Sequence, residues 1–161
     1  MLNKNPDGLF FVAGAIDVAR LAQQARRQAP ALPIGASEWA ASEQLIELGG
    51  KVVEGLLIVQ NYDRDDDSPR YREFREAYFK RFQTNPGYSS VSAYDAAMVL
   101  FDALSMRAKG ESIKAAVLRN GPYQGLQQRI AFDANGDTER KVFFTEIRDG
   151  SYRKLDEVNA R

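Results

Sequence analysis

Cysteine and histidine are both absent from the 161 residues of this chain. Their absence excludes thiol nucleophiles, thiolate zinc sites and Ser-His triads, and it removes the commonest metal ligand. No apolar run approaches the roughly 20 residues that are needed to span a bilayer. The 22 basic residues balance 22 acidic ones. With a net charge of zero, the chain has no electrostatic reason to bind nucleic acid or an anionic membrane.

Several catalytic motifs are missing as well. The sequence contains no phosphate-binding loop, no Gly-x-Gly-x-x-Gly and no Gly-x-Ser-x-Gly elbow. Aspartate, glutamate and lysine remain as catalytic groups, but no spacing pairs them convincingly. The first residues, 1–6, show no signal-peptide pattern.

What is present is an alternation of apolar runs and helical patterns, with 44% apolar residues to build a core. The pattern predicts strands at 9–13, 32–36 and 53–59, and helices at 16–29 and 40–48. The continuous run Leu9–Ala13 is typical of a strand buried on both faces. Strands that alternate with single crossover helices indicate a parallel α/β sheet, which binds ligands beyond the carboxyl ends of its strands.

After residue 60 the predicted structure changes first to helices and then to strands. An acidic loop at 61–67 reads as a linker or hinge, and helices are predicted from Pro69 to 82, at 89–108 and at 111–119. Strands are then predicted at 126–132 and 141–148. Asn135-Gly136 between them is typical of a hairpin turn, and Asp149-Gly150 is a second turn.

The first candidate site follows from the predicted sheet. If the strands at 9–13 and 32–36 are parallel neighbours, Ala13, Gly14 and Ala15 lie beside Ser37, Glu38 and Trp39. Small residues at a helix N-terminus favour an anion, Glu38 suits an ammonium group, and Trp39 can stack on a ligand. The alternative is structural: Gly14 makes a tight turn, Ser37 or Glu38 caps a helix, and Trp39 packs in the core.

Three further patterns have simpler explanations. The acidic run 63–67 has poor calcium-ligand spacing, and Asp133-x-Asn135-Gly136-Asp137 has Phe144 where a calcium loop needs glutamate. The aromatic stripe at 71, 74, 78 and 82 is most simply a buried helix face. Tyr88 and Ser89 open a helix, and their hydroxyls either contact a ligand or serve as caps. We therefore predict no metal site.

The order of several phrases resembles a known family over nearly the whole chain. They are Pro6-Asp7-x-Leu9-Phe10-Phe11-x-Ala13-Gly14, Leu21-Ala22-Gln23-Gln24-Ala25-Arg26, Pro33-Ile34-Gly35, Val53-Glu54-Gly55-Leu56, Phe74-x-x-x-Tyr78, Ser92-Ala93-Tyr94-Asp95-Ala96-Ala97 and Gly125-Leu126 through Phe132-Asp133-x-Asn135-Gly136-Asp137. In this order and spacing they resemble the type 1 periplasmic binding proteins of ABC transporters, above all those for leucine, isoleucine and valine.

The resemblance implies a two-lobed α/β fold that closes on a solute, with no catalysis and no cofactor. The chain would be the C-terminal portion: 6–60 the latter part of the second lobe, 61–124 a crossover and helices of the first lobe, and 125–155 strands returning to the second. The lobe would be an incomplete parallel sheet flanked by helices, and it would carry a C-terminal β-hairpin. The implied location is periplasmic or extracellular, and the implied partners are a small polar solute and a membrane permease.

The resemblance also implies where the ligand binds. The second-lobe contacts fall on the loop from Ala13 to Ile16 and on Ser37 or Glu38, whose carboxylate would bind an ammonium group. The family often has a tyrosine in the first loop, where this chain has Gly14 or Ala15, and this argues against a branched-chain amino acid. An aromatic contact from the first lobe falls near Tyr88 and Ser89.

Two other functions remain open from the sequence. One is the ligand-sensing domain of a receptor with the same architecture, and the other is a small flavodoxin-like α/β enzyme. A partial fold exposes sheet edges and apolar faces. We therefore expect one of two outcomes. Either the chain forms a homodimer, with or without exchange of elements between the two copies, or its elements adopt a rearranged packing.

Overall fold

The structure is a computed structural model that describes the backbone of residues 2–160 and the side chains of residues 3–158. It divides into two compact units. The first runs to Asn61 and includes Val142–Glu157, and the second comprises Tyr62–Lys141 with the residues from Val158 onward. The chain therefore passes from the first unit to the second, returns to the first at Val142 and joins the second again from Val158.

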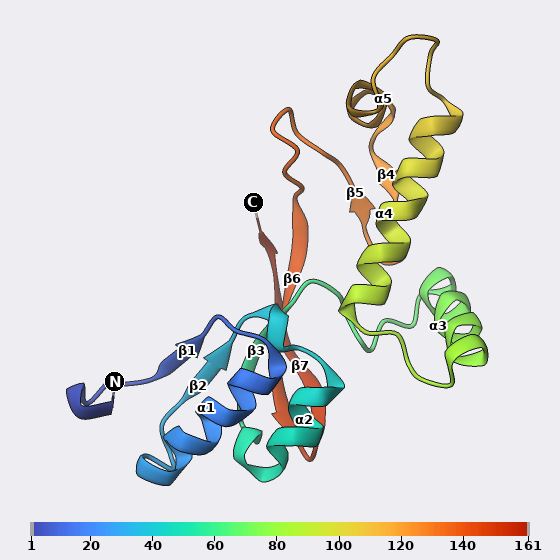
Figure 1. Ribbon diagram of the computed structural model, residues 1–161. Helices are drawn as coiled ribbons and strands as arrows, with labels where there is room; N and C mark the ends of the chain where they lie inside the picture. Colours follow the sequence, from blue (N-terminus) through green and yellow to red (C-terminus); the bar gives the residue numbers. More distant parts are fainter. Residues whose placement is uncertain (1, 161) are drawn as a thin grey trace. The chain divides into compact units, whose positions relative to one another are not determined.

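The first unit is built on a five-stranded sheet (Figure 1). Its strands are β1 (Leu9–Phe11), β2 (Ile34–Ala36), β3 (Leu57–Gln60), β6 (Arg140–Arg148) and β7 (Ser151–Ala160), in the order β1-β2-β3-β6-β7. β1, β2 and β3 are parallel, whereas β6 is antiparallel to β3. The expected parallel-dominated sheet is therefore confirmed, with an antiparallel pair at one end.

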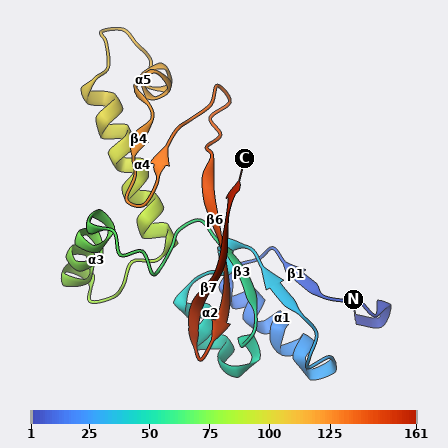
Figure 2. The same ribbon diagram turned by 180° about the vertical axis from the view of Figure 1, so that it is seen from behind.

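Helices cover one face of this sheet. α1 (Ala15–Gln28) and α2 (Glu43–Gly49) lie in front of the strands in Figure 1 and behind them in Figure 2. Three short 3-10 helices, η1 (Leu2–Lys4), η2 (Glu38–Ala40) and η3 (Gly50–Val53), complete the unit. The apolar face of α1, with Val18 and Ala22 fully buried, packs on Ile34 and Ile58 of the sheet.

The opposite face of the sheet is open, which corrects one prediction. Phe11, Ala36 and Ile58 are aligned across the sheet and buried, but the neighbouring row, Phe10 and Leu57, is 61% and 46% exposed. The run at 9–13 is therefore a strand buried on one face only, because no second helical layer among the described residues of this unit covers Phe10. The strand also ends at Phe11, two residues earlier than predicted.

The C-terminal hairpin is present, but with a different turn from the first one predicted. β6 and β7 are neighbours joined by Asp149-Gly150, both with positive φ, as a two-residue hairpin turn requires. Glu54 accepts hydrogen bonds from the backbone N–H groups of both turn residues, at 2.9 and 2.8 Å. Asn135-Gly136 closes only an isolated bridge between Phe132 and Thr138, so the pairing predicted for 126–132 with 141–148 is wrong.

The second unit is mainly helical. It contains α3 (Pro69–Phe82), α4 (Tyr88–Ser105) and α5 (Ile113–Asn120), and a two-stranded sheet of β4 (Tyr123–Gln124) and β5 (Arg129–Ile130). Of the strand predicted at 126–132, only Arg129–Ile130 (β5) is a strand, and it pairs with β4, which was not predicted. None of the helices among residues 2–160 is both long and apolar enough to span a membrane.

Two small apolar clusters hold the second unit together. One gathers Val99 and Ala103 of α4, Ala116 of α5, Tyr123 and Ile130. The other gathers Tyr62, Tyr71, Val91 and Leu126, with Phe74 and Tyr88 packed against it. The predicted aromatic stripe of α3 is accordingly buried at Tyr71 but 57% exposed at Phe82.

A buried carboxylate ties α4 to the segment that follows β4. Asp95 is only 7% exposed, and its Oδ1 accepts a hydrogen bond of 2.8 Å from the backbone N–H of Leu126. Burial raises the pKa of Asp95 above its ordinary value, and this hydrogen bond opposes the rise. Gly125 is required beside it, because a Cβ there would lie 2.6 Å from the Gln128 carbonyl and 3.0 Å from Asp95 Oδ2.

Candidate functional site

The first candidate site lies at the carboxyl ends of β1 and β2. The two strands are parallel neighbours with Phe11 paired to Ala36, and the backbone N–H of Ser37 donates to the Phe11 carbonyl at 2.9 Å. The loop that follows β1 therefore begins beside the loop that follows β2, as the sequence predicts. This edge is the place where open parallel sheets bind ligands.

Gly14 is the N-cap of α1, and its side of the site is open. Its φ of −74° is one that any residue adopts, and a Cβ built there would meet nothing within 4 Å. The tight-turn explanation for Gly14 is therefore wrong. As the N-cap, Gly14 provides no side-chain hydrogen bond to α1, which leaves N–H groups of the first turn available to an anion or a ligand carbonyl. Ala13 is half-buried and Ala15 is buried.

Ser37 carries the second polar group of this edge. It occupies the N-cap position of η2, but its side chain makes no cap hydrogen bond. Its Oγ is buried and has no hydrogen-bond partner among the described residues. Because buried hydroxyls nearly always have a hydrogen-bond partner, we expect a water molecule or a polar group of a ligand to bind this atom.

Trp39 points away from the core. It is 61% exposed, whereas the next two residues, Ala40 and Ala41, are fully buried. The two alanines anchor η2 against the core, and the indole is left outside. The alternative that Trp39 packs in the core is therefore wrong. Glu38 begins the same 3-10 helix and is half-buried.

Two apolar residues near this edge are exposed, which the sequence did not predict; Ile16 ends the predicted contact loop, whereas Val12 lies outside it. Val12 and Ile16 flank the Ala13–Ala15 loop and are 67% and 43% exposed. In the sequence they read as part of a buried strand and of the apolar face of α1. Only the end of β1 at Phe11 and the start of α1 at Ala15 leave both side chains facing solvent.

Tyr88 and Ser89 belong to the second unit, at the N-terminus of α4. Tyr88 is half-buried against the cluster of Tyr62, Tyr71, Val91 and Leu126, and Ser89 is exposed. The N-cap of α4 is Gly87, so neither residue occupies the cap position. The role of Tyr88 and Ser89 in ligand binding stays a prediction.

Aspartates of the two acidic segments accept hydrogen bonds from backbone N–H groups of their own turns. Asp63 Oδ1 accepts from the backbone N–H of Asp65, and Asp66 Oδ1 from that of Ser68. Asp133 Oδ1 accepts from three backbone N–H groups of its turn, and these bonds, led by the one from Asp137, lower its pKa. Among the residues that the structure describes, no acidic group of three or more could hold a metal ion.

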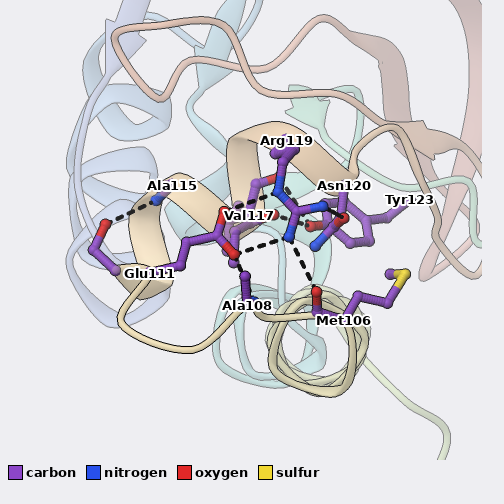
Figure 3. A network of polar contacts seen from close by, with 10 residues as sticks. Met106, Ala108, Glu111, Ala115, Val117, Arg119, Asn120 and Tyr123 are labelled. Carbon is purple, nitrogen blue, oxygen red and sulfur yellow. Dashed lines mark hydrogen bonds and ion pairs between the residues drawn. The ribbon is translucent and has the colours of Figure 1, made fainter.

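A polar network in the second unit joins the loop after α4 to α5 (Figure 3). Arg119 donates from Nε and Nη2 to the two carboxylate oxygens of Glu111, both at 2.8 Å, and Nη2 also donates to the Met106 carbonyl. The Arg119 guanidinium lowers the pKa of Glu111 to about 2. The network stabilises a loop, and its members lie outside the predicted site.

Comparison with known proteins places the fold. A family model described as periplasmic binding protein matches residues 1–151. Among curated proteins, none matches the chain. The solved leucine-binding protein LivK of Thermotoga maritima is 28% identical with a TM-score of 0.86, over 98% of this chain and 46% of that one.

Two less similar structures share the fold. The branched-chain amino acid binding protein LivJ of Streptococcus pneumoniae, solved with isoleucine, has a TM-score of 0.83 at 17% identity, over 96% of this chain and 45% of that one. A solute-binding protein of R. palustris, solved with benzoate, has a TM-score of 0.79 at 14% identity, over 96% and 44%. The chain thus spans less than half the length of these structures. Because the family model matches nearly the whole length of this chain, the chain belongs to the periplasmic binding protein family, as its sequence resemblance implied.

Proposed function

We propose that this chain is part of a solute-binding protein that captures a small polar organic solute, an amino acid or a related carboxylate, for uptake by an ABC transporter. The observation that supports it most is the edge beyond β1 and β2, where Ser37 Oγ is buried with no hydrogen-bond partner among the described residues and where Gly14 gives α1 no side-chain cap. Membership of the family supports solute binding as the role of this edge. It also favours a protein that is not an enzyme.

The chemistry of the edge suits a solute with three parts. The N–H groups at the start of α1 and the Ser37 hydroxyl suit a carboxylate. The Glu38 carboxylate suits an ammonium group. Trp39, Val12 and Ile16 offer exposed apolar surface for the rest of the solute. Tyr88 and Ser89 are proposed as further contacts from the second unit.

Partners and location follow from the same proposal. A protein that delivers a solute to an ABC transporter contacts its permease and works outside the cytoplasmic membrane, in the periplasm or on the cell surface. The receptor-type sensing domain remains the alternative, because sensing and delivery both rest on binding a solute.

The fluorescence of Trp39 offers a direct test, because it is the only tryptophan of the chain. Titration with leucine, isoleucine, glutamate and benzoate should give a saturable change in its emission for at least one class. Glu38→Gln should weaken the response to amino acids and leave that to benzoate unchanged. Glu47→Gln, on the exposed surface of α2, is the matched control.

The outcomes separate the alternatives. A response to amino acids that Glu38→Gln removes supports the proposed role of Glu38. A response to benzoate alone supports solute capture but contradicts an ammonium site. If no solute changes the emission and none raises the melting temperature, the proposal is wrong for this chain, since a ligand at about 100 times its Kd should stabilise it by about 2.7 kcal/mol.

A further inference from the structure

The Asn-Gly pair occurs twice in this chain, at Asn120-Gly121 and at Asn135-Gly136. Asparagine that precedes glycine is prone to spontaneous deamidation, because glycine has no Cβ to hinder the approach of its backbone nitrogen to the asparagine side chain. That nitrogen loses its proton and bonds to the asparagine Cγ, and the side-chain nitrogen leaves as ammonia. Water then adds to the cyclic imide and opens it to aspartate or isoaspartate. Because the two pairs share this chemistry, their surroundings in the fold decide which of them reacts.

Asn135 and Gly136 lie in an exposed turn. Both residues are exposed, and the turn is closed by the isolated bridge between Phe132 and Thr138. A Cβ added to Gly136 would meet no atom within 4 Å, so the space around this residue is open. A turn with few packed contacts opens locally at a small cost in free energy. Asn135 can therefore reach the geometry of attack while both units stay folded.

The Asp133 carboxylate binds the nitrogen that would attack. Its Oδ1 accepts a hydrogen bond from the backbone N–H of Gly136 at 2.9 Å, and the Asp133 carbonyl accepts from the same N–H at 3.1 Å. Oδ1 also accepts from the backbone N–H of Asn135 at 2.8 Å, which fixes the backbone of the asparagine. A carboxylate in this position opposes loss of the Gly136 proton, because the resulting anionic nitrogen would face a negative charge. The reaction therefore has to wait until these bonds open.

Asn120 is held by contacts of a different kind. It is the last residue of α5 and half-buried, and its Nδ2 is buried with no hydrogen-bond partner among the described residues. Its Oδ1 accepts from Arg119 Nη1 at 2.8 Å (Figure 3), and the Tyr123 hydroxyl donates to the Val117 carbonyl in the last turn of α5 at 2.9 Å. Closure of the five-membered imide requires a ψ angle far from the helical value. The end of α5 must therefore unwind before Asn120 can react.

We propose that Asn135 is the deamidation site of the folded chain, that Asp133 slows its reaction, and that Asn120 is protected by α5. The product places a carboxylate at position 135, between Asp133 and Asp137 in the sequence. In the isoaspartate form, the backbone of the turn also gains one methylene. The turn precedes β6, by which the chain returns to the first unit at Val142. The modification therefore alters a segment through which the chain passes between its two units.

Incubation of the chain in mildly alkaline buffer, followed by peptide mass spectrometry, tests the proposal. Trypsin cleaves after Arg119, Arg129 and Arg140, so the two pairs fall in neighbouring peptides, 120–129 and 130–140. The same incubation in urea gives the deamidation rate of each pair in the unfolded chain. We expect the ratio of the folded rate to the unfolded rate to be several-fold higher for Asn135 than for Asn120.

The variant Asp133→Ala isolates the effect of the carboxylate. In the folded chain it should accelerate deamidation of Asn135 about fivefold, the factor that corresponds to one typical net hydrogen bond. In urea it should leave the rate unchanged. Asp137→Ala is the matched control, since it removes a carboxylate of the same turn but keeps the backbone hydrogen bond from the Asp133 N–H to the carbonyl of residue 137, at 3.0 Å. It should not change the rate, and far-UV circular dichroism confirms that both variants are folded.

Three outcomes would overturn the proposal. If Asn120 and Asn135 have the same ratio of folded to unfolded rate, α5 gives no protection. If Asp133→Ala leaves the rate of Asn135 in the folded chain unchanged, the hydrogen bond to the Gly136 N–H does not slow the reaction. If Asp137→Ala accelerates the reaction as much as Asp133→Ala does, the effect belongs to the net charge of the turn and not to that bond.

Discussion

The surroundings of two carboxylates in the second unit shift their pKa values in opposite directions. Asp95 and Glu111 are both carboxylates of this unit, yet burial raises the pKa of the first, and the Arg119 guanidinium lowers that of the second to about 2. Neither shift is visible in the sequence, since the burial of Asp95 depends on the fold of the whole unit and Arg119 lies 8 residues from Glu111. Both shifts are explained by structural contacts, and neither indicates a catalytic group.

Glu111 predicts a pH dependence of stability. Because its pKa is lower in the folded state, the stability that it contributes is present above the unfolded value of 4.5 and is lost as the pH falls towards about 2. The melting temperature of the wild type should therefore fall more steeply between pH 5 and about 2 than that of Glu111→Gln. Scanning calorimetry of both proteins at matched ionic strength gives the comparison. Equal slopes would show that the ion pair does not form in solution.

At the scale of elements, two serines at helix N-caps differ in what they do. The Ser112 Oγ accepts a hydrogen bond from the backbone N–H of Ala115 at 3.1 Å, whereas Ser42 at the N-cap of α2 makes no such bond. Ser112→Ala should therefore lower the free energy of unfolding by about 1 kcal/mol. Ser42→Ala, the matched control, should change it by much less. Urea denaturation followed by circular dichroism measures both, and equal losses would contradict the cap.

The predicted elements were most accurate where local chemistry alone decides the structure. Pro69 is the first residue of α3, as predicted, because its ring fits only the first turn of a helix. The hairpin at Asn135-Gly136 was wrong for the opposite reason. A turn motif fixes the turn, but the partner of β6 is β3, more than 80 residues earlier, and such pairing depends on the packing of the sheet.

At the scale of the whole molecule, the first unit depends on chain segments far apart. β3 is completed by β6, and the buried Gln60 amide donates to the Thr145 hydroxyl at 2.8 Å. A chain that ends at Lys141 should therefore lose slow amide exchange in Leu57–Gln60, while α4 and α5 keep theirs. Hydrogen-exchange mass spectrometry of the truncated and full-length chains tests this. Unchanged protection of β3 would show that the first unit folds without the C-terminal strands.

The candidate site was also predicted in part. The sequence predicted that the loops after residues 13 and 36 lie side by side, because parallel strands end at one edge. It left the role of Trp39 open, since an aromatic residue beside two alanines fits the core or the surface equally well. Exposure of Val12 and Ile16 was missed, because apolar residues at strand and helix spacing normally indicate burial.

By itself, the sequence determined the parallel α/β pattern of the first unit, the helices of the second and the membership of the periplasmic binding protein family. These follow from local periodicity, from turn and cap residues, and from short phrases in a fixed order. Only the tertiary structure decided that β6 pairs with β3, that Ser37 Oγ is buried without a partner among the described residues and that Trp39 faces outward. Such features depend on contacts between distant segments, whose free energy no local stretch of sequence contains.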